Sequence, residues 1–263
     1  MKFPLRLSVD LFRSRLSRAF ANSSANAAIF HLSPAAFSST NQKEIEAESN
    51  PGAAVMEIPA SVLAQTAAPV LWVAGQEGGG QDPLQHPVIG RIAAALNKAG
   101  RNVFLHTNGV GLRQRIHEFR PDSRLLLTVE LAGRQEVHDQ AVGQPGCFLR
   151  AIEGIRAAKL SGFRVCAHVT VNSSTDVCET SELFEYLDNY DVDGYIVSSG
   201  GRAIEPSSAG KFQELLEEVR SLVRCSRWEY FSSLLEASYA VPSEKKASVV
   251  VPGADSNACE EIV

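Results

Sequence analysis

The chain has 263 residues, of which 44% are apolar, and this is enough to bury the core of one α/β domain of enzyme size. Its formal net charge of −5 argues against a nucleic-acid-binding protein, since such proteins need a basic face to displace counterions from phosphates. No apolar run approaches the roughly 20 residues that a membrane-spanning helix needs.

The cysteines indicate a reducing compartment. They are odd in number, and no two of them have a short metal-ligand spacing such as C-x-x-C. We therefore expect reduced thiols in a cytoplasmic protein. The five cysteines are Cys147, Cys166, Cys178, Cys225 and Cys259.

Residues 1–24 are predicted to form a basic amphipathic helix, because the first 20 residues carry five basic side chains and one acid, Asp10, beside an irregular apolar stripe. Such a helix docks on its own domain, lies on an anionic membrane surface, or serves as an organelle transit peptide. Residues 25–54 are rich in Ala, Ser and Asn and are expected to be irregular, within a barrel domain that spans 25–238. Residues 239–263 are expected to form a flexible tail.

Strand-length apolar runs then alternate with helix-length amphipathic segments. The predicted helices begin near Pro87 and 148, include 183–187 and 212–222, and two of them end at Gly100 and Gly162. A βαβα order with strands that are apolar throughout predicts a parallel sheet covered by helices, as a closed or partly closed barrel or as an open doubly wound sheet. The predicted strands are 69–75, 102–109, 124–131, 164–171 and 194–200.

A weak internal repeat favours the barrel. The segments "AGRNVFLHT" and "SGFRVCAHV" align at an offset of 62 residues and place His106 on His168. Glu130 ends the strand between them. Alternate strands of a parallel barrel contribute to the same interior layer, and chemistry gathers at their carboxyl ends, so we expect these three candidate catalytic residues to converge on one mouth.

Two interpretations of this convergence remain open. Two histidines and one carboxylate form a metal site suited to Fe(II) or Zn(II) with open positions. Alternatively, His106 and His168 are hydrogen-bonded core residues, and Glu130 pairs with Arg101, Arg124 or another cation. The second interpretation is favoured, so no metal ligand is assigned.

Several motifs in order resemble the radical S-adenosylmethionine (SAM) superfamily, and most closely its adenosylhopene-forming branch in hopanoid biosynthesis. They are "VAGQE", "PLQHPVI", "VFLHTNG", "TVELAGRQEVHDQAV", "GCFLRAIEGIRAAKLSGFRV" and "DVDGYIVSSG", which together cover about 68–200. The resemblance implies a partial (β/α)6 barrel of the TIM type, in agreement with the order of the predicted elements.

The cluster motif of that family is missing. Radical SAM enzymes hold a [4Fe-4S] cluster with C-x-x-x-C-x-x-C in the loop after the first strand, and the cluster chelates SAM. Here the first strand is predicted at 28–33, and the following loop, "PAAFSSTNQKE", contains no cysteine. Because hydroxyl groups do not readily replace thiolates, the sequence predicts no conventional cluster.

The resemblance also implies residues that contact SAM. In the family the second strand ends in G-G-E-P, and here Gly75, Gln76 and Glu77 stand at its first three positions, before an insertion with three further glycines. Thr107 and Asn108 match a second family motif. Two alternatives remain for this glycine-rich segment. One is a phosphate-binding loop, although no G-K-[ST] follows, and the other is a surface loop without function.

Other positions depart from the family pattern, or match it with residues that are not interpreted as catalytic. Ala132 stands where an aspartate is usual, His106 where the adenosylhopene branch has a cysteine, and Ser199 where a proline is common. The retained pair His138 and Asp139 is interpreted as helix capping.

Three functions follow from this pattern. The favoured one is a degenerate barrel that binds SAM, another small ligand or a partner protein. The second is an active radical SAM enzyme, lipid- or hopanoid-related, with an atypical or partner-supplied cluster. The third is a metal-dependent enzyme that uses His106, Glu130 and His168.

Overall fold

The computed structural model describes residues 3–20, 27–31, 68–75, 82–199 and 209–239. Its centre is one sheet of parallel strands that are hydrogen-bonded in sequence order. The strands are β1 (Ala27–His31), β2 (Val70–Ala74), β3 (Asn102–Thr107), β4 (Leu125–Glu130), β5 (Arg164–Val171) and β6 (Gly194–Ser199).

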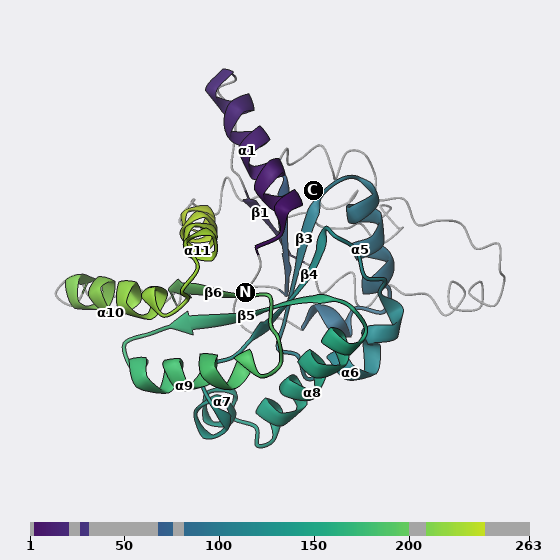
Figure 1. Ribbon diagram of the computed structural model, residues 1–263. Coiled ribbons are helices and arrows are strands. Elements are labelled where there is room, and N and C mark those ends of the chain that lie inside the picture. The colour runs from purple at the N-terminus through teal and green to yellow at the C-terminus, as the bar shows by residue number, and fades with distance from the viewer. Residues whose placement is uncertain (1–2, 21–26, 32–67, 76–81, 200–208, 240–263) are drawn as a thin grey trace, which may run out of the picture.

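The strand order distinguishes the two predicted architectures. A doubly wound sheet reverses its order at a switch point, whereas this sheet runs from β1 to β6 without reversal. Right-handed crossovers then place all connecting helices on one side, and the sheet curls around the other side. Figure 1 shows the strand direction turning progressively from β1 to β6. The predicted partial (β/α)6 barrel is therefore confirmed.

The connecting helices agree with the predicted amphipathic segments. Gly100 and Gly162 each have φ of +82° where a helix stops, as the sequence predicts. The elements are η1 (Pro83–Gln85), α5 (Ile89–Lys98), α6 (Leu112–Arg115), η2 (Ile116–Glu118), α7 (Gln135–Val142), α8 (Cys147–Leu160), α9 (Val177–Asp188) and α10 (Ala209–Ser221).

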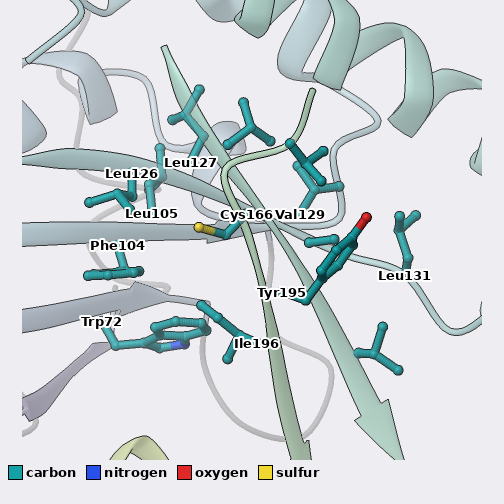
Figure 2. Packing of buried hydrophobic residues seen from close by; sticks show 14 of the residues in the cluster. Trp72, Phe104, Leu105, Leu126, Leu127, Val129, Leu131, Cys166, Tyr195 and Ile196 are labelled. Atoms are coloured by element: carbon teal, nitrogen blue, oxygen red, sulfur yellow. The ribbon is translucent and has the colours of Figure 1, made fainter. Parts of the chain in front are cut away.

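The two faces of the sheet bury different side chains. Register partners in a parallel sheet share a face, and successive residues alternate between faces. Tyr195 faces the helices, where its ring stacks on Phe184 of α9 at 4.1 Å. Trp72 and Phe104 are register partners on the inner face, and their rings stack at 5.9 Å. Figure 2 shows these two rings side by side in the buried core.

Helix α11 (Ser226–Tyr239) fills the inner side of the curled sheet. Its Phe231 ring stacks on Phe104 at 4.7 Å, and the helix packs against both β6 and β1. Trp228 is completely buried. Gly194 makes room for it, because a Cβ at that position would overlap with the indole. Helix α11 therefore closes the gap that the partial barrel leaves between its first and last strands.

Helix α1 (Leu5–Phe20) docks at the end of the barrel where the strands begin, their amino-terminal end. Its Leu7 and Leu11 are buried. Asp10 accepts a hydrogen bond of 3.0 Å from Asn102 Nδ2 and lies 3.7 Å from Arg124. Of the three interpretations of the basic helix, these contacts support docking on its own domain.

The outer side of α1 stays apolar. Leu5 and Phe12 are 76% and 62% exposed, Val9 is exposed beside them, and Arg6 and Arg13 flank the stripe. Contact between residues 1–20 and a membrane surface therefore stays a prediction. Within the described ranges, no helix combines the length and the apolar character needed to cross a bilayer. The predicted domain boundary at 24/25 and the tail beyond 239 lie outside those ranges.

Candidate active site at the carboxyl ends of the strands

His106, Glu130 and His168 come together at the mouth of the barrel, as the internal repeat predicts. They end or nearly end β3, β4 and β5, and Glu130 is the register partner of His168. His106 Nε2 lies 2.9 Å from His168 Nδ1 and 3.7 Å from Glu130 Oε2. Equivalent strand positions at an offset of 62 residues thus become direct neighbours in space.

Two neighbouring residues form hydrogen bonds with members of this group. His168 Nε2 lies 2.7 Å from Ser198 Oγ on β6, and Thr170 donates a 3.3 Å hydrogen bond to Glu130 Oε1. His168 and Ser198 are buried, whereas the side chain of Glu130 is 45% exposed. Glu130 therefore lies at the solvent-exposed side of the group, 3.7 Å from His106 Nε2, and Ser198 lies at its buried side.

The histidines of this group are neutral near pH 7. Burial lowers the pKa of His168 well below its usual value, and neighbouring His106 lowers it further. Burial also lowers the pKa of His106, against the opposing effect of Glu130 and Asp82. In the neutral pair, one ring nitrogen donates its proton to the other across the 2.9 Å contact.

The expected pairing of Glu130 with Arg101 or Arg124 is wrong. Arg101 donates a 3.0 Å hydrogen bond to the carbonyl oxygen of Ala68, and Arg124 lies beside Asp10. Both arginines precede a strand, so they lie at the amino-terminal end of the parallel sheet, opposite Glu130. The described partners of Glu130 are His106 and Thr170.

The floor of the group is Trp72. Its ring stacks on His106 at a centroid distance of 5.1 Å and meets His168 edge-on at 5.5 Å. Beside it, Thr128 is the register partner of His106 and is completely buried. Within the described part of the chain, Thr128 Oγ1 and Trp72 Nε1 have no hydrogen-bond partner. The site therefore combines ordered imidazoles with buried polar atoms that are not satisfied.

The five residues assigned to SAM contact fall into two groups. Gln76 and Glu77 lie outside the described residues, and Gly75 is half-buried at the end of β2. Thr107 Oγ1 donates to Asp82 at 2.9 Å and accepts a hydrogen bond from the Gly109 amide. Asn108 Oδ1 accepts a hydrogen bond from the Val110 amide.

Asp82 organises this turn. Its carboxylate accepts hydrogen bonds from Thr107 Oγ1, from the Asn108 amide at 2.6 Å and from the Leu84 amide at 2.8 Å. It therefore caps η1 and fixes that segment to the end of β3. Sequence reasoning missed this residue, although an aspartate immediately before Pro83 is a recognisable helix-start signal.

Asp139 acts as a helix cap, as the sequence predicts. Its carboxylate accepts hydrogen bonds from the Gly146 amide at 2.7 Å and the Phe148 amide at 2.8 Å, at the start of α8. These bonds lower the pKa of Asp139. Neighbouring His138 is buried, and its Nδ1 accepts a hydrogen bond from the Ala132 amide. Within the described residues this pair therefore supports the loop and the helix start.

We expect His138→Gln to make the free energy of unfolding less sensitive to acid. Burial lowers the pKa of His138 below 6.5, so the unfolded chain takes up the proton first as the pH falls. The contribution of neutral His138 to the free energy of unfolding is therefore fully present above about pH 6.5. It is lost below this pH, by at most about 1.4 kcal/mol per pH unit. Urea unfolding at several pH values tests this, with exposed His117→Gln as the matched control. Equal slopes in both variants would contradict the assignment.

The described cysteines do not form a cluster-binding set. Cys147 starts α8, Cys166 lies inside the barrel on β5, Cys178 is exposed on α9, and Cys225 precedes α11. Burial raises the pKa of Cys166 well above its usual value, which opposes thiolate formation. Across the described ranges, His106, Glu130 and His168 form the single group of three metal-ligating side chains. The residues present therefore do not fit the three-thiolate requirement of a [4Fe-4S] cluster.

Comparison with known proteins gives a sequence likeness to one curated protein. The chain is 32% identical over 129 residues to the AdoMet-dependent heme synthase of Methanosarcina barkeri (strain Fusaro / DSM 804). The match covers 48% of this chain and 36% of the heme synthase, so the chain spans about a third of that relative's length. No family model matches the chain.

Two solved structures are similar to the chain at low sequence identity. Streptococcus suis SuiB bound to S-adenosylmethionine has a TM-score of 0.49 and 10% identity, with 80% of this chain and 48% of SuiB covered. The protein anSMEcpe with bound AdoMet has a TM-score of 0.42 and 15% identity, with 73% of this chain and 59% of anSMEcpe covered.

Proposed function

We propose, from the premise that the chain is a relative of the radical SAM superfamily, that it binds a small ligand at the mouth of its barrel without holding the family's iron–sulfur cluster. The observation that carries the proposal is the distribution of reactive side chains. Imidazole, carboxylate and hydroxyl groups gather at the carboxyl ends of the strands. Of the described thiols, Cys166 lies deeper in the barrel on β5, and Cys147, Cys178 and Cys225 lie in helices or beside one. Ligands of parallel barrels bind at this end.

SAM is the first ligand to test. The Methanosarcina barkeri relative is an AdoMet-dependent heme synthase, and the sequence at and after the end of β2 in this chain keeps Gly75 and Glu77 of the resembled motif. Asp82 holds the adjoining turn at Thr107 and Asn108 in one conformation. A preformed turn favours binding because less conformational entropy is lost.

We expect calorimetric titration of the purified chain with SAM to show micromolar binding, about −8 kcal/mol. Glu77→Ala and Asp82→Asn should weaken it at least tenfold, the second because an amide cannot accept all the hydrogen bonds that the carboxylate accepts. Asp191→Asn is the matched control, since Asp191 is fully exposed and precedes β6 at the opposite end of the sheet. Absence of binding heat in the folded wild-type chain would overturn SAM as the ligand.

The radical SAM alternative requires a cluster from elsewhere. Anaerobic reconstitution is expected to leave the chain colourless, because the loop after β1 has no cysteine in the sequence. About four irons per chain together with an EPR signal on reduction would overturn the cluster-free proposal. A hopanoid-related substrate, a partner protein and a cytoplasmic location stay predictions.

A further inference from the structure

We propose that His106, Glu130 and His168 bind one divalent transition-metal ion of the Fe(II) or Zn(II) class. The proposal is independent of SAM binding, because none of the three side chains is among the residues assigned to SAM contact. Imidazole nitrogen and carboxylate oxygen are the donors that such ions prefer, and three protein ligands leave positions open for water or substrate. The site would give this barrel a metal centre at the end of the strands, made without cysteine.

The distances between the donor atoms fit a common ion. Ligands at ~2.1 Å from one ion lie about 3.0–3.4 Å apart at octahedral or tetrahedral angles. Here the two histidine nitrogens are 2.9 Å apart and His106 Nε2 is 3.7 Å from Glu130 Oε2. All three donor atoms lie within 4.8 Å of one another. Small side-chain rotations of Glu130, whose side chain is 45% exposed, are enough to complete the set.

The surroundings orient the donors as metal sites require. His168 Nε2 bonds to Ser198 Oγ at 2.7 Å, so Nδ1 is left to coordinate. Thr170 donates to Glu130 Oε1, which leaves Oε2 facing the imidazoles. Trp72 stacks on the ring of His106 and fixes its plane. His168 and Glu130 therefore each have an outer hydrogen-bond partner, and His106 is held by ring stacking.

A second observation points to an occupant at this place. Thr128 Oγ1 is buried and has no hydrogen-bond partner among the described residues, which costs roughly 1–3 kcal/mol when it is not compensated. Thr128 is the register partner of His106 and shares the inner face with Glu130. Water on the proposed ion would give Thr128 Oγ1 a partner.

The test uses the full-length chain after treatment with a chelator. We expect titration with Zn²⁺, and with Co²⁺ as a spectroscopic probe, to saturate at one ion per chain. Elemental analysis after dialysis should still find that ion bound. Glu130→Gln and His106→Gln should weaken binding at least a hundredfold. Ser198→Ala should weaken it 10–100-fold, the range expected when an outer partner of a ligand is lost. Co²⁺ absorption is expected to show nitrogen and oxygen ligands without a thiolate charge-transfer band.

Matched controls exclude other donors. His117→Gln and Cys178→Ser change an exposed histidine in η2 and an exposed thiol in α9, and both variants should bind Zn²⁺ as the wild type does. Circular dichroism is used to check that each variant is folded. The proposal is overturned if the folded wild type retains no ion, or if binding survives in both Glu130→Gln and His106→Gln. SAM binding is measured in a separate titration of the same samples. Failure of the SAM proposal and failure of the metal proposal can therefore be told apart.

Discussion

Replacement of Trp228 by alanine is expected to lower the free energy of unfolding by about 3–5 kcal/mol, the range for deletion of a fully buried large aromatic side chain. The indole of Trp228 is 0% exposed, contacts the ring of Phe3 at 4.7 Å, and donates a 3.1 Å hydrogen bond to the carbonyl oxygen of Asp193. It also anchors α11 across the open side of the barrel. Urea unfolding followed by far-UV circular dichroism measures the loss.

Two further variants show whether the effect comes from packing. Phe12→Ala truncates an aromatic ring that is 62% exposed and should change stability by less than about 0.5 kcal/mol. Gly194→Ala should destabilise the wild type, because its Cβ overlaps with the indole, yet cost little in the Trp228→Ala background. Additive effects of the two changes would contradict the close packing of α11 on β6.

The positions of the strands along the chain were accessible from the sequence because helix-covered parallel strands are apolar throughout and therefore stand out as short runs. The convergence of His106 and His168 was accessible for a similar reason. Equivalent positions in repeated βα units occupy equivalent places at the end of the sheet, so an offset of 62 residues becomes a contact of 2.9 Å. Regular repetition converts sequence spacing into spatial position.

Contacts without such repetition could not be predicted. Trp228 and Phe231 reach the barrel interior from a helix whose apolar residues show no clean period, and Phe231 meets Phe104 across 127 positions of the chain. Asp82 acts through a turn formed with Thr107, which only the folded chain brings near. The expected partners of Glu130 were wrong because charge alone does not say at which end of a strand an arginine lies.

The core and the candidate site share a side chain. Trp72 stacks on Phe104 in the barrel interior and on His106 at the mouth. Packing of the interior therefore fixes the imidazole pair from the inner side of the barrel. Ser198 forms a hydrogen bond with His168, and Thr170 forms one with Glu130. A change in the core should consequently alter the chemistry of the mouth as well as the stability of the fold.

Trp72→Ala is expected to have both effects. The side chain is 0% exposed, so its removal should lower the free energy of unfolding by about 3–5 kcal/mol. The cavity is bordered by His106, His168 and Thr128 and is polar enough to admit water. Hydration weakens the desolvation that lowers both histidine pKa values, so these should rise toward 6.5.

Trp72→Phe is the matched variant. Phenylalanine keeps an aromatic ring under His106 and removes an indole N–H that has no hydrogen-bond partner in the described residues, so the loss of stability should be smaller. NMR titration of the imidazole signals in chelator-treated protein measures the pKa values of all three proteins. Histidine pKa values that stay low in folded Trp72→Ala would show that the other walls of the site, and not the indole, exclude water from the pair. A rise in the alanine variant alone would establish Trp72 as the residue that keeps both imidazoles neutral.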